Sequence, residues 1–278
     1  MTVVVVTDSS ARLPADLLEQ WGIRVVPLHI LLDGADLRDG VDDIPDDIHK
    51  LAATTAAATP AELADAYQQA LADSGADGVV AVHISSALSG TCRAAERTAA
   101  DLDPNVRVVD SKSAAMGIGF VALAAARAAA AGGDLDAVTD AARSAVARGH
   151  AFIVVHRLDN LRRSGRIGGA AAWLGTALAL KPLLRIDDGK LVLAQRVRTI
   201  SHATEVMIDR VCEAVGDGTA ALAVHHVNNP DGATEVATAL GKRLPACEPA
   251  IVTELGPVLA LHVGAGAVAV SVAKPPVD

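Results

Sequence analysis

The chain has 278 residues, enough for one large domain or two of moderate size, and carries a formal net charge of −9. This acidic balance argues against a nucleic acid partner, because a polyanion would be repelled. The three cysteines, Cys92, Cys212 and Cys247, are scattered and match neither a disulfide framework nor a zinc site.

The chain is expected to be soluble and cytoplasmic. Its N-terminus, MTVVVVTDSS, lacks a basic flank and reaches Asp8 too soon for a signal peptide. The longest apolar run, FVALAAARAAAA, is interrupted by Arg127 and is shorter than the ~18 residues of a membrane span. We therefore expect no integral membrane segment.

In the first half of the chain, short β-branched runs alternate with alanine-rich helical segments. The runs predict buried strands at 3–7, 78–84, 106–110 and 151–156. Apolar strands separated by helices are typical of a parallel sheet that helices cover on both faces. The expected helices are 60–74, opened by the Thr59-x-x-Glu62 capping box, and the pair 117–131 and 135–148.

After residue 156 the sequence becomes basic and rich in glycine, in RLDNLRRSGRIGG, which suits a domain boundary or a functional loop. Asp187-Asp188-Gly189 then predicts a hairpin between two strands. The remaining expected elements are helices at 201–216 and 231–244 and strands at 219–227, 249–255 and 266–273. We therefore predict two α/β domains, 1–156 with the parallel sheet and 157–278 with a mixed sheet.

Hydroxyl side chains gather where the strand at 78–84 ends. Ser85, Ser86 and Ser89 follow it, and similar groups follow two other strands in TDSS (7–10) and DSKS (110–113). Ligands of open parallel sheets bind at the carboxyl ends of the strands, and a helix N-terminus there favours a carboxylate or phosphate. The alternative is that Ser89 only caps a helix and the other serines satisfy turns.

Several other kinds of site are poorly supported. The chain has no GxSxG elbow, no phosphate-binding loop and no dinucleotide fingerprint. The acidic stretch 33–47 does not match a calcium loop, so we expect a solvated loop without metal. His225 and His226 are neighbours on a strand and point to opposite faces, which disfavours a two-histidine metal site. His262 stands out because glycines flank it in GPVLALHVGAG.

The order of motifs along nearly the whole chain resembles the DegV family. The motifs are VTDSSARLP, VVPLHILLDG, SSALSGT, VVDSKSAAMGIGF, LDNLRRSGRIG, KPLLRIDDGKL, RVRT and GPVLALHVGAG. This resemblance implies a long-chain fatty acid bound in a tunnel between two α/β domains. It also implies a role as the non-catalytic binding subunit of a two-component fatty acid kinase, which presents the carboxylate to a separate ATP-dependent subunit and carries the acyl-phosphate.

The resemblance also assigns residues. The carboxylate would be held by the SSALSGT segment, through Ser85, Ser86, Ser89 and Gly90, together with Thr55 and His262. Arg166 and Arg198 would contact the kinase subunit, so their replacement by alanine is expected to reduce phosphorylation and leave lipid affinity intact. The resemblance implies no cofactor, no metal and no catalytic residue, and it leaves room for transient membrane contact to exchange lipid.

A core rich in Ala, Val, Leu and Ile suits such a tunnel, since aromatic residues make up only 2% of the chain, but compositional bias explains it as well. Two other functions stay open. One is an enzyme that cleaves a phosphate or acyl ester in the serine-rich crevice with His262 as base. The other is a lipid chaperone or sensor without a kinase partner.

Overall fold

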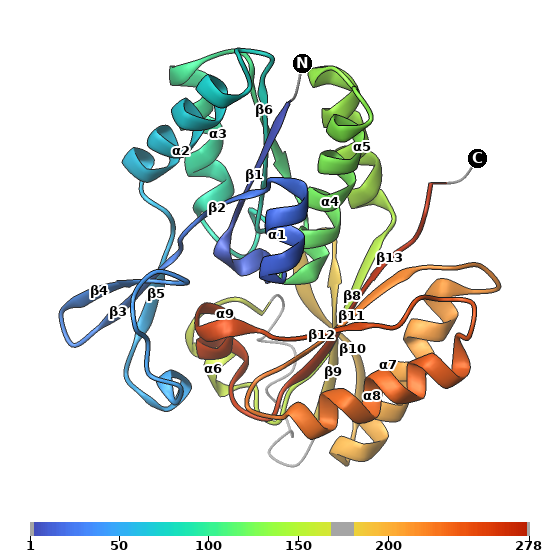
Figure 1. Cartoon of the computed structure of the whole chain (residues 1–278). Coiled ribbons are helices and arrows are strands. Elements are labelled where there is room, and N and C mark those ends of the chain that lie inside the picture. The colour runs from blue at the N-terminus through green and yellow to red at the C-terminus, as the bar shows by residue number, and fades with distance from the viewer. Residues whose placement is uncertain (1–2, 168–180, 277–278) are drawn as a thin grey trace.

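The computed structural model describes residues 3–167 and 181–276, which form two α/β units, one above the other in Figure 1. The upper unit contains a parallel sheet and the lower unit a mixed sheet, as the sequence predicts. No helix of the described part of the chain is both long and apolar enough to cross a membrane.

The parallel sheet has the strand order β2-β1-β6-β7. Its strands are β1 (Val4–Asp8), β2 (Arg24–Val26), β6 (Val79–His83) and β7 (Val106–Asp110). One face is covered by α2 (Pro60–Asp73) and α3 (Thr91–Leu102), the other by α4 (Met116–Ala130) and α5 (Leu135–Ala147), while α1 (Ala15–Trp21) packs beside α4 (Figure 1). The Thr59–Glu62 capping box is present at the start of α2, so this predicted helix start is confirmed.

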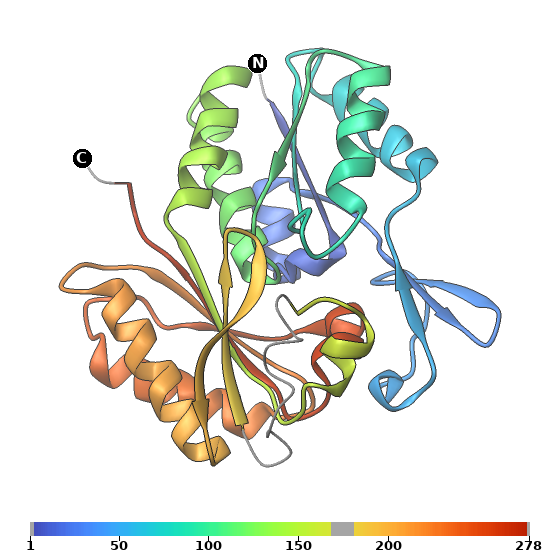
Figure 2. The ribbon, with the colours of Figure 1, turned by 180° about the vertical axis from the view of Figure 1, so that it is seen from behind.

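The mixed sheet has the order β10-β9-β8-β13-β11-β12. Its strands are β8 (Gly149–Val154), β9 (Lys181–Asp187), β10 (Lys190–Val197), β11 (Ala221–His226), β12 (Ile251–Glu254) and β13 (Val268–Ala273). Helices α7 (Ile200–Val215) and α8 (Pro230–Arg243) cover its outer face (Figure 2).

One strand assignment is wrong. Residues 151–156 were expected in the parallel sheet, but β8 pairs antiparallel with β9 and β13 in the mixed sheet. The two sheets therefore divide the chain just before Gly149, whereas the predicted boundary at 156/157 puts β8 in the first domain. A strand buried on both faces shows the same apolar run in either kind of sheet, so its pattern could not distinguish them.

The predicted hairpin at Asp187-Asp188-Gly189 is confirmed, as β9 and β10 pair antiparallel around it. Asp188 and Gly189 have φ of 44° and 79°, the positive values that a two-residue type I′ turn requires. The turn reaches the other unit, because the Ser85 hydroxyl donates to the Gly189 carbonyl over 2.8 Å.

A third, small sheet projects from the side of the molecule (Figure 1). It has the order β4-β3-β5 and consists of β3 (His29–Leu32), β4 (Ala35–Arg38) and β5 (Thr54–Ala56). The expectation of a loop throughout 33–47 is wrong for β4. Asp33 and Gly34, with φ of 50° and 85°, form a hairpin turn whose Asp-Gly signal lies within the acidic stretch.

The hydrophobic core continues from one unit into the other. One cluster joins α4 and α5 to the inner face of the mixed sheet, including Ile153, Leu184 and Ala269. The sheet face away from α7 and α8 therefore packs toward α4 and the carboxyl ends of β1, β6 and β7. This arrangement brings the loops after the parallel strands over the mixed sheet.

Candidate functional site

A pocket lies between the two units, and both contribute to its lining. It encloses about 1010 Å³ between protein atoms, including the space at its mouth. The upper unit supplies the loops after β6 and β7, and the small third sheet supplies β5. The lower unit supplies residues of β8, β9, β10, β11, β13, α6 (Asp159–Arg163) and α9 (Gly256–Val263).

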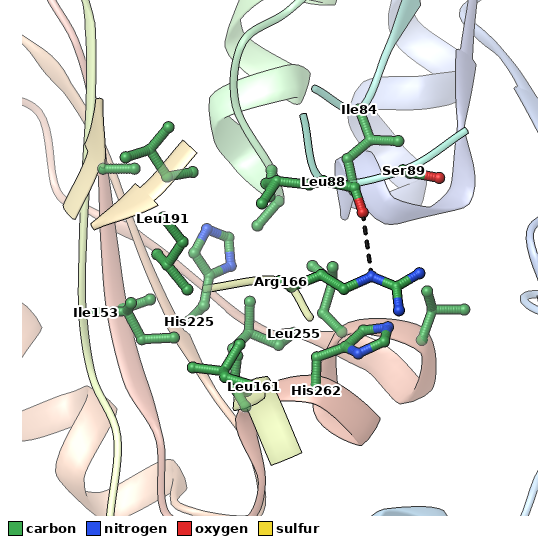
Figure 3. A pocket seen from close by; sticks show the side chains of 18 of the residues that line it. Ile84, Leu88, Ser89, Ile153, Leu161, Arg166, Leu191, His225, Leu255 and His262 are labelled. Atoms are coloured by element: carbon green, nitrogen blue, oxygen red, sulfur yellow. Dashed lines mark hydrogen bonds between the residues drawn. The ribbon is translucent and has the colours of Figure 1, made fainter. Parts of the chain in front are cut away.

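Most of the pocket lining is aliphatic, and Figure 3 shows these side chains around a common space. The larger apolar residues are Leu28, Ile84, Leu88, Phe152, Ile153, Leu161, Ile186, Leu191, Leu255, Val258, Leu259, Val263 and Val270. Such a wall binds hydrocarbon through burial of apolar surface and offers few hydrogen bonds to a sugar or nucleotide.

The polar end of the pocket contains two residues that are far apart in the sequence and in direct contact. The Thr55 Oγ1 atom on β5 lies 2.9 Å from Nε2 of His262 on α9. β5 holds Thr55 in place by pairing it with Ile30. Thr55 and His262, which the resemblance assigned to one carboxylate site, are therefore direct neighbours.

The start of α9 depends on a glycine. Gly256 has a φ of 74°, and a β-carbon there would collide with the guanidinium of Arg12. Arg12 donates to the Glu254 carbonyl over 3.2 Å and lies 3.6 Å from Asp39. This packing fixes the direction in which α9 leaves β12 and so positions His262.

His262 is neutral at physiological pH. Burial, followed by the positive charge of Arg166, lowers its pKa to about 4. Its Nδ1 atom is buried without a hydrogen-bond partner among the described residues. A neutral imidazole can give a proton through one nitrogen and accept through the other, so His262 can orient the Thr55 hydroxyl toward an oxygen ligand.

Ser89 and Gly90 also line this pocket. The Ser89 hydroxyl lies 3.0 Å from the Thr91 hydroxyl and accepts the Thr91 backbone N–H at 3.3 Å. Gly90 precedes the first residue of α3, so the positive end of that helix dipole lies close to the pocket. A hydroxyl next to a helix N-terminus favours a negatively charged ligand atom.

Ser85 and Ser86 lie outside the pocket lining in the described part of the chain. Ser85 is buried and its hydroxyl donates to Gly189, while the Ser86 hydroxyl donates to Asp110 Oδ2 over 2.6 Å. Both serines therefore brace the loop between β6 and α3. Of the four residues of this segment that were assigned to the carboxylate, Ser89 and Gly90 reach the pocket.

The start of that loop rests on a buried polar chain that the sequence analysis missed. Tyr67 and His83 share a hydrogen bond of 2.7 Å, and His83 Nδ1 lies 3.1 Å from Asp8 Oδ2. The same carboxylate oxygen accepts the Ile84 backbone N–H at 2.9 Å. Three strand or helix elements thus fix the backbone that carries the lining residue Ile84. These residues are far apart in the sequence, so no local motif indicates that they are in contact.

The two arginines assigned to partner docking lie in different surroundings. Arg166 is half-buried, lines the pocket near His262 and donates to the Leu88 carbonyl at 3.4 Å (Figure 3). Arg198 is exposed and follows the last residue of β10.

Two more polar residues of the lining, His225 and Ser271, were not predicted as site residues. They lie within apolar strands. The one signal in the sequence was the two-residue periodicity of a strand, which puts His225 and His226 on opposite faces, so that one of them faces the pocket. Among the described residues, no group of three or more histidine, cysteine or acidic side chains could hold a metal ion.

Comparison with known proteins gives consistent results. The model of a family described as "Uncharacterised protein, DegV family" matches residues 2–275. A DegV domain-containing protein of Mycobacterium bovis is 76% identical over 279 residues, which cover 99% of this chain and 100% of the relative. Another from Streptomyces coelicolor is 40% identical over 277 residues, 98% of each chain.

Solved structures with the same fold include two whose ligands are stated. A DegV family protein from Thermus thermophilus, described as fatty acid binding, matches with a TM-score of 0.91 and 34% identity over 99% of this chain and 100% of that one. DegV from Bacillus subtilis, described as a fatty acid binding protein, matches with a TM-score of 0.89 and 27% identity over the same shares of the two chains.

Proposed function

The chain belongs to the DegV family, and we propose that it binds one long-chain fatty acid in the pocket between its two units. The observation that carries this proposal is an aliphatic pocket with a polar group at one end, formed by Thr55, Ser89, Gly90 and His262. The fatty acid binding described for the Thermus thermophilus and Bacillus subtilis proteins supports it.

The apolar wall supplies most of the binding free energy. Each buried methylene contributes about 0.8 kcal/mol, so a palmitoyl chain offers on the order of 10 kcal/mol before the cost of ordering it. A desolvated carboxylate must be hydrogen-bonded, because an unpaired buried charge would cancel much of this gain. The hydroxyls of Thr55 and Ser89 and the N-terminus of α3 provide donors, and Arg166 provides a nearby positive charge.

We further propose that the chain presents the fatty acid carboxylate to a separate ATP-dependent kinase subunit and then holds the acyl-phosphate. Neutral donors around the head group suit this role, since they hold the carboxylate without a direct ion pair to it. On this proposal the chain acts in the cytoplasm and has no catalytic residue, cofactor or metal of its own. A lipid chaperone or sensor without a kinase partner is the alternative.

Fatty acid binding is tested by titrating the delipidated chain with palmitate and oleate, with their methyl esters as controls. The acids are expected to bind more tightly than the esters, since the esters lack the charge that the polar end recognises. Saturable binding of neither acid by the folded chain would contradict the proposal and favour a water-soluble anion as ligand.

The kinase partnership needs a variant that spares the pocket. Arg198 is exposed and outside the lining, so Arg198→Ala is expected to lower acyl-phosphate formation with an added kinase subunit and to leave the palmitate Kd unchanged. Arg210→Ala is the control, because Arg210 is also an exposed arginine but lies on α7. Acyl-phosphate formation that is equal in the wild type and both variants would exclude Arg198 from docking, and no formation at all would favour the chaperone or sensor.

A further inference from the structure

Two polar side chains interrupt the apolar wall of the pocket away from its Thr55–His262 end. They are His225 on β11 and Ser271 on β13, with exposed fractions of 0% and 2%. Their Nε2 and Oγ atoms are 3.4 Å apart. In Figure 3 the imidazole of His225 lies among the lining side chains, between Leu191 and Leu255.

The surroundings of His225 determine where its proton lies. The backbone N–H of Met116 points at Nε2 over 3.4 Å, and a backbone N–H can only donate. Nε2 therefore carries the lone pair, and in the neutral ring the proton is on Nδ1. Burial lowers the pKa of His225 to about 3, so the ring is neutral at physiological pH.

The resulting Nδ1–H donor has no hydrogen-bond partner among the described residues. A buried donor without an acceptor is costly and uncommon, so this one calls for an explanation. A plain alkyl chain would leave it unpaired, because methylene groups accept no hydrogen bond.

The backbone beside His225 is strained as well. Ala115, the residue before Met116, has a φ of 52° and a ψ of −142°, a region that residues with a β-carbon rarely adopt. Ala115 also lines the pocket. Such strain is concentrated at ligand sites, and here it holds the N–H that fixes the tautomer of His225.

We propose that His225, positioned by Ser271 and Met116, forms a second polar subsite that receives a hydroxyl group on the acyl chain. The Nδ1–H of His225 donates to the hydroxyl oxygen of the ligand. Ser271 contacts Nε2 on the other side of the ring and, with the Met116 N–H, keeps the proton on Nδ1, so it is a positioning residue. This inference rests on the proposed function, and it narrows the ligand class to long-chain hydroxy fatty acids.

The test is a comparison of stearate with a series of hydroxystearates that differ in hydroxyl position. Each is measured by displacement of a fluorescent fatty acid from the delipidated, full-length chain. Because the carboxylate end is fixed, the preference is expected at one or two neighbouring positions only. There the hydroxy acid should bind roughly 2- to 10-fold more tightly than stearate, the gain from one well-formed hydrogen bond.

Variants assign the preference to His225. His225→Leu is expected to bring the ratio of the two Kd values close to one, and Ser271→Ala, which removes a contact that positions the ring, is expected to lower the ratio by a smaller factor. Ser89→Ala, the same kind of change at the polar end, is expected to weaken both ligands and keep the ratio. If His225→Leu does not fold, the nitrogen-15 signal of His225 Nδ1 decides: it should shift when the preferred hydroxystearate is added and not when stearate is added.

The outcomes separate this inference from the proposed function. Tight binding of stearate with no gain at any hydroxyl position would overturn the subsite and leave fatty acid binding in place. Binding of neither stearate nor any hydroxystearate would overturn both. Nitrogen-15 NMR of the histidine side chains gives an independent check, because a proton on Nε2 of His225 would contradict the donor assignment.

Discussion

Replacing Thr55 with valine removes one hydroxyl from the polar end of the pocket and preserves the shape of the side chain. Thr55 Oγ1 is 2.9 Å from His262 Nε2 and lines the pocket. Valine is at least as favourable in a strand, so β5 is expected to persist. The variant therefore tests the contribution of the hydroxyl to carboxylate binding.

The expected loss follows from the type of hydrogen bond. A hydrogen bond to a charged group contributes about 1.5–3 kcal/mol, which corresponds to a roughly 10- to 150-fold weaker Kd for palmitate. Methyl palmitate carries no charge, so its Kd is expected to change much less. The variant also leaves a buried His262 nitrogen unpaired, which should lower the free energy of unfolding by about 1 kcal/mol.

The assay is a titration of both proteins with palmitate and with methyl palmitate, after circular dichroism has shown that each variant is folded. Thr54→Val is the matched control, because Thr54 is exposed and points to the other face of the same strand. The reasoning is refuted if Thr55→Val binds palmitate as tightly as Thr54→Val does. It is also refuted if acid and ester lose affinity equally.

Three further predictions concern the apolar wall of the pocket, the protonation of His262 and the contact between Gly189 and Ser85. Ala269→Phe fills part of the lining and should cost about 0.8 kcal/mol for each methylene that no longer fits, so binding of long acids weakens while short acids are spared in a chain-length series. The pKa of His262 is lowered from 6.5 to about 4 by burial and by Arg166, so the folded state disfavours its protonation and stability is lost as the pH falls through this range. Between pH 6.5 and 4, His262→Asn should therefore reduce the change of the unfolding free energy with pH by about 1.4 kcal/mol per pH unit. The exposed His202→Asn is the control and should leave this pH dependence unchanged. Denaturant titrations that give the same pH dependence for the wild type and His262→Asn would contradict the prediction. Gly189→Ala should destabilise the chain more than Gly34→Ala, because both have positive φ but only at Gly189 does the new β-carbon meet a neighbouring side chain, that of Ser85; equal thermal shifts would show that the tie between the units contributes little.

Local chemistry made much of the fold predictable. The Thr59–Glu62 capping box and the Asp188-Gly189 turn are signals that depend on a few neighbouring residues, and both are confirmed. The long alanine-rich helices and β-branched strands follow from periodicity in the same way. The sheet to which β8 belongs depends on its pairing with β9 and with β13, the latter more than a hundred positions away, and no local pattern indicates either partner.

The candidate site shows the same division. The sequence located the segment after β6. Which of its serines reach the pocket depends on the path of the loop, and that path is determined by hydrogen bonds to Asp110 and Gly189. Thr55 and His262 came from family resemblance, since 207 positions separate them. His225 and Ser271 were not predicted, because the sequence of an apolar strand does not show whether a polar residue in it faces the packed core or a cavity.

The most direct test of fatty acid binding is native mass spectrometry of the purified chain, followed by denaturation and lipid extraction. The account predicts one fatty acid per chain, lost on denaturation and regained when palmitate or oleate is added to the delipidated protein. A folded chain that carries no lipid and takes up neither acid would contradict it.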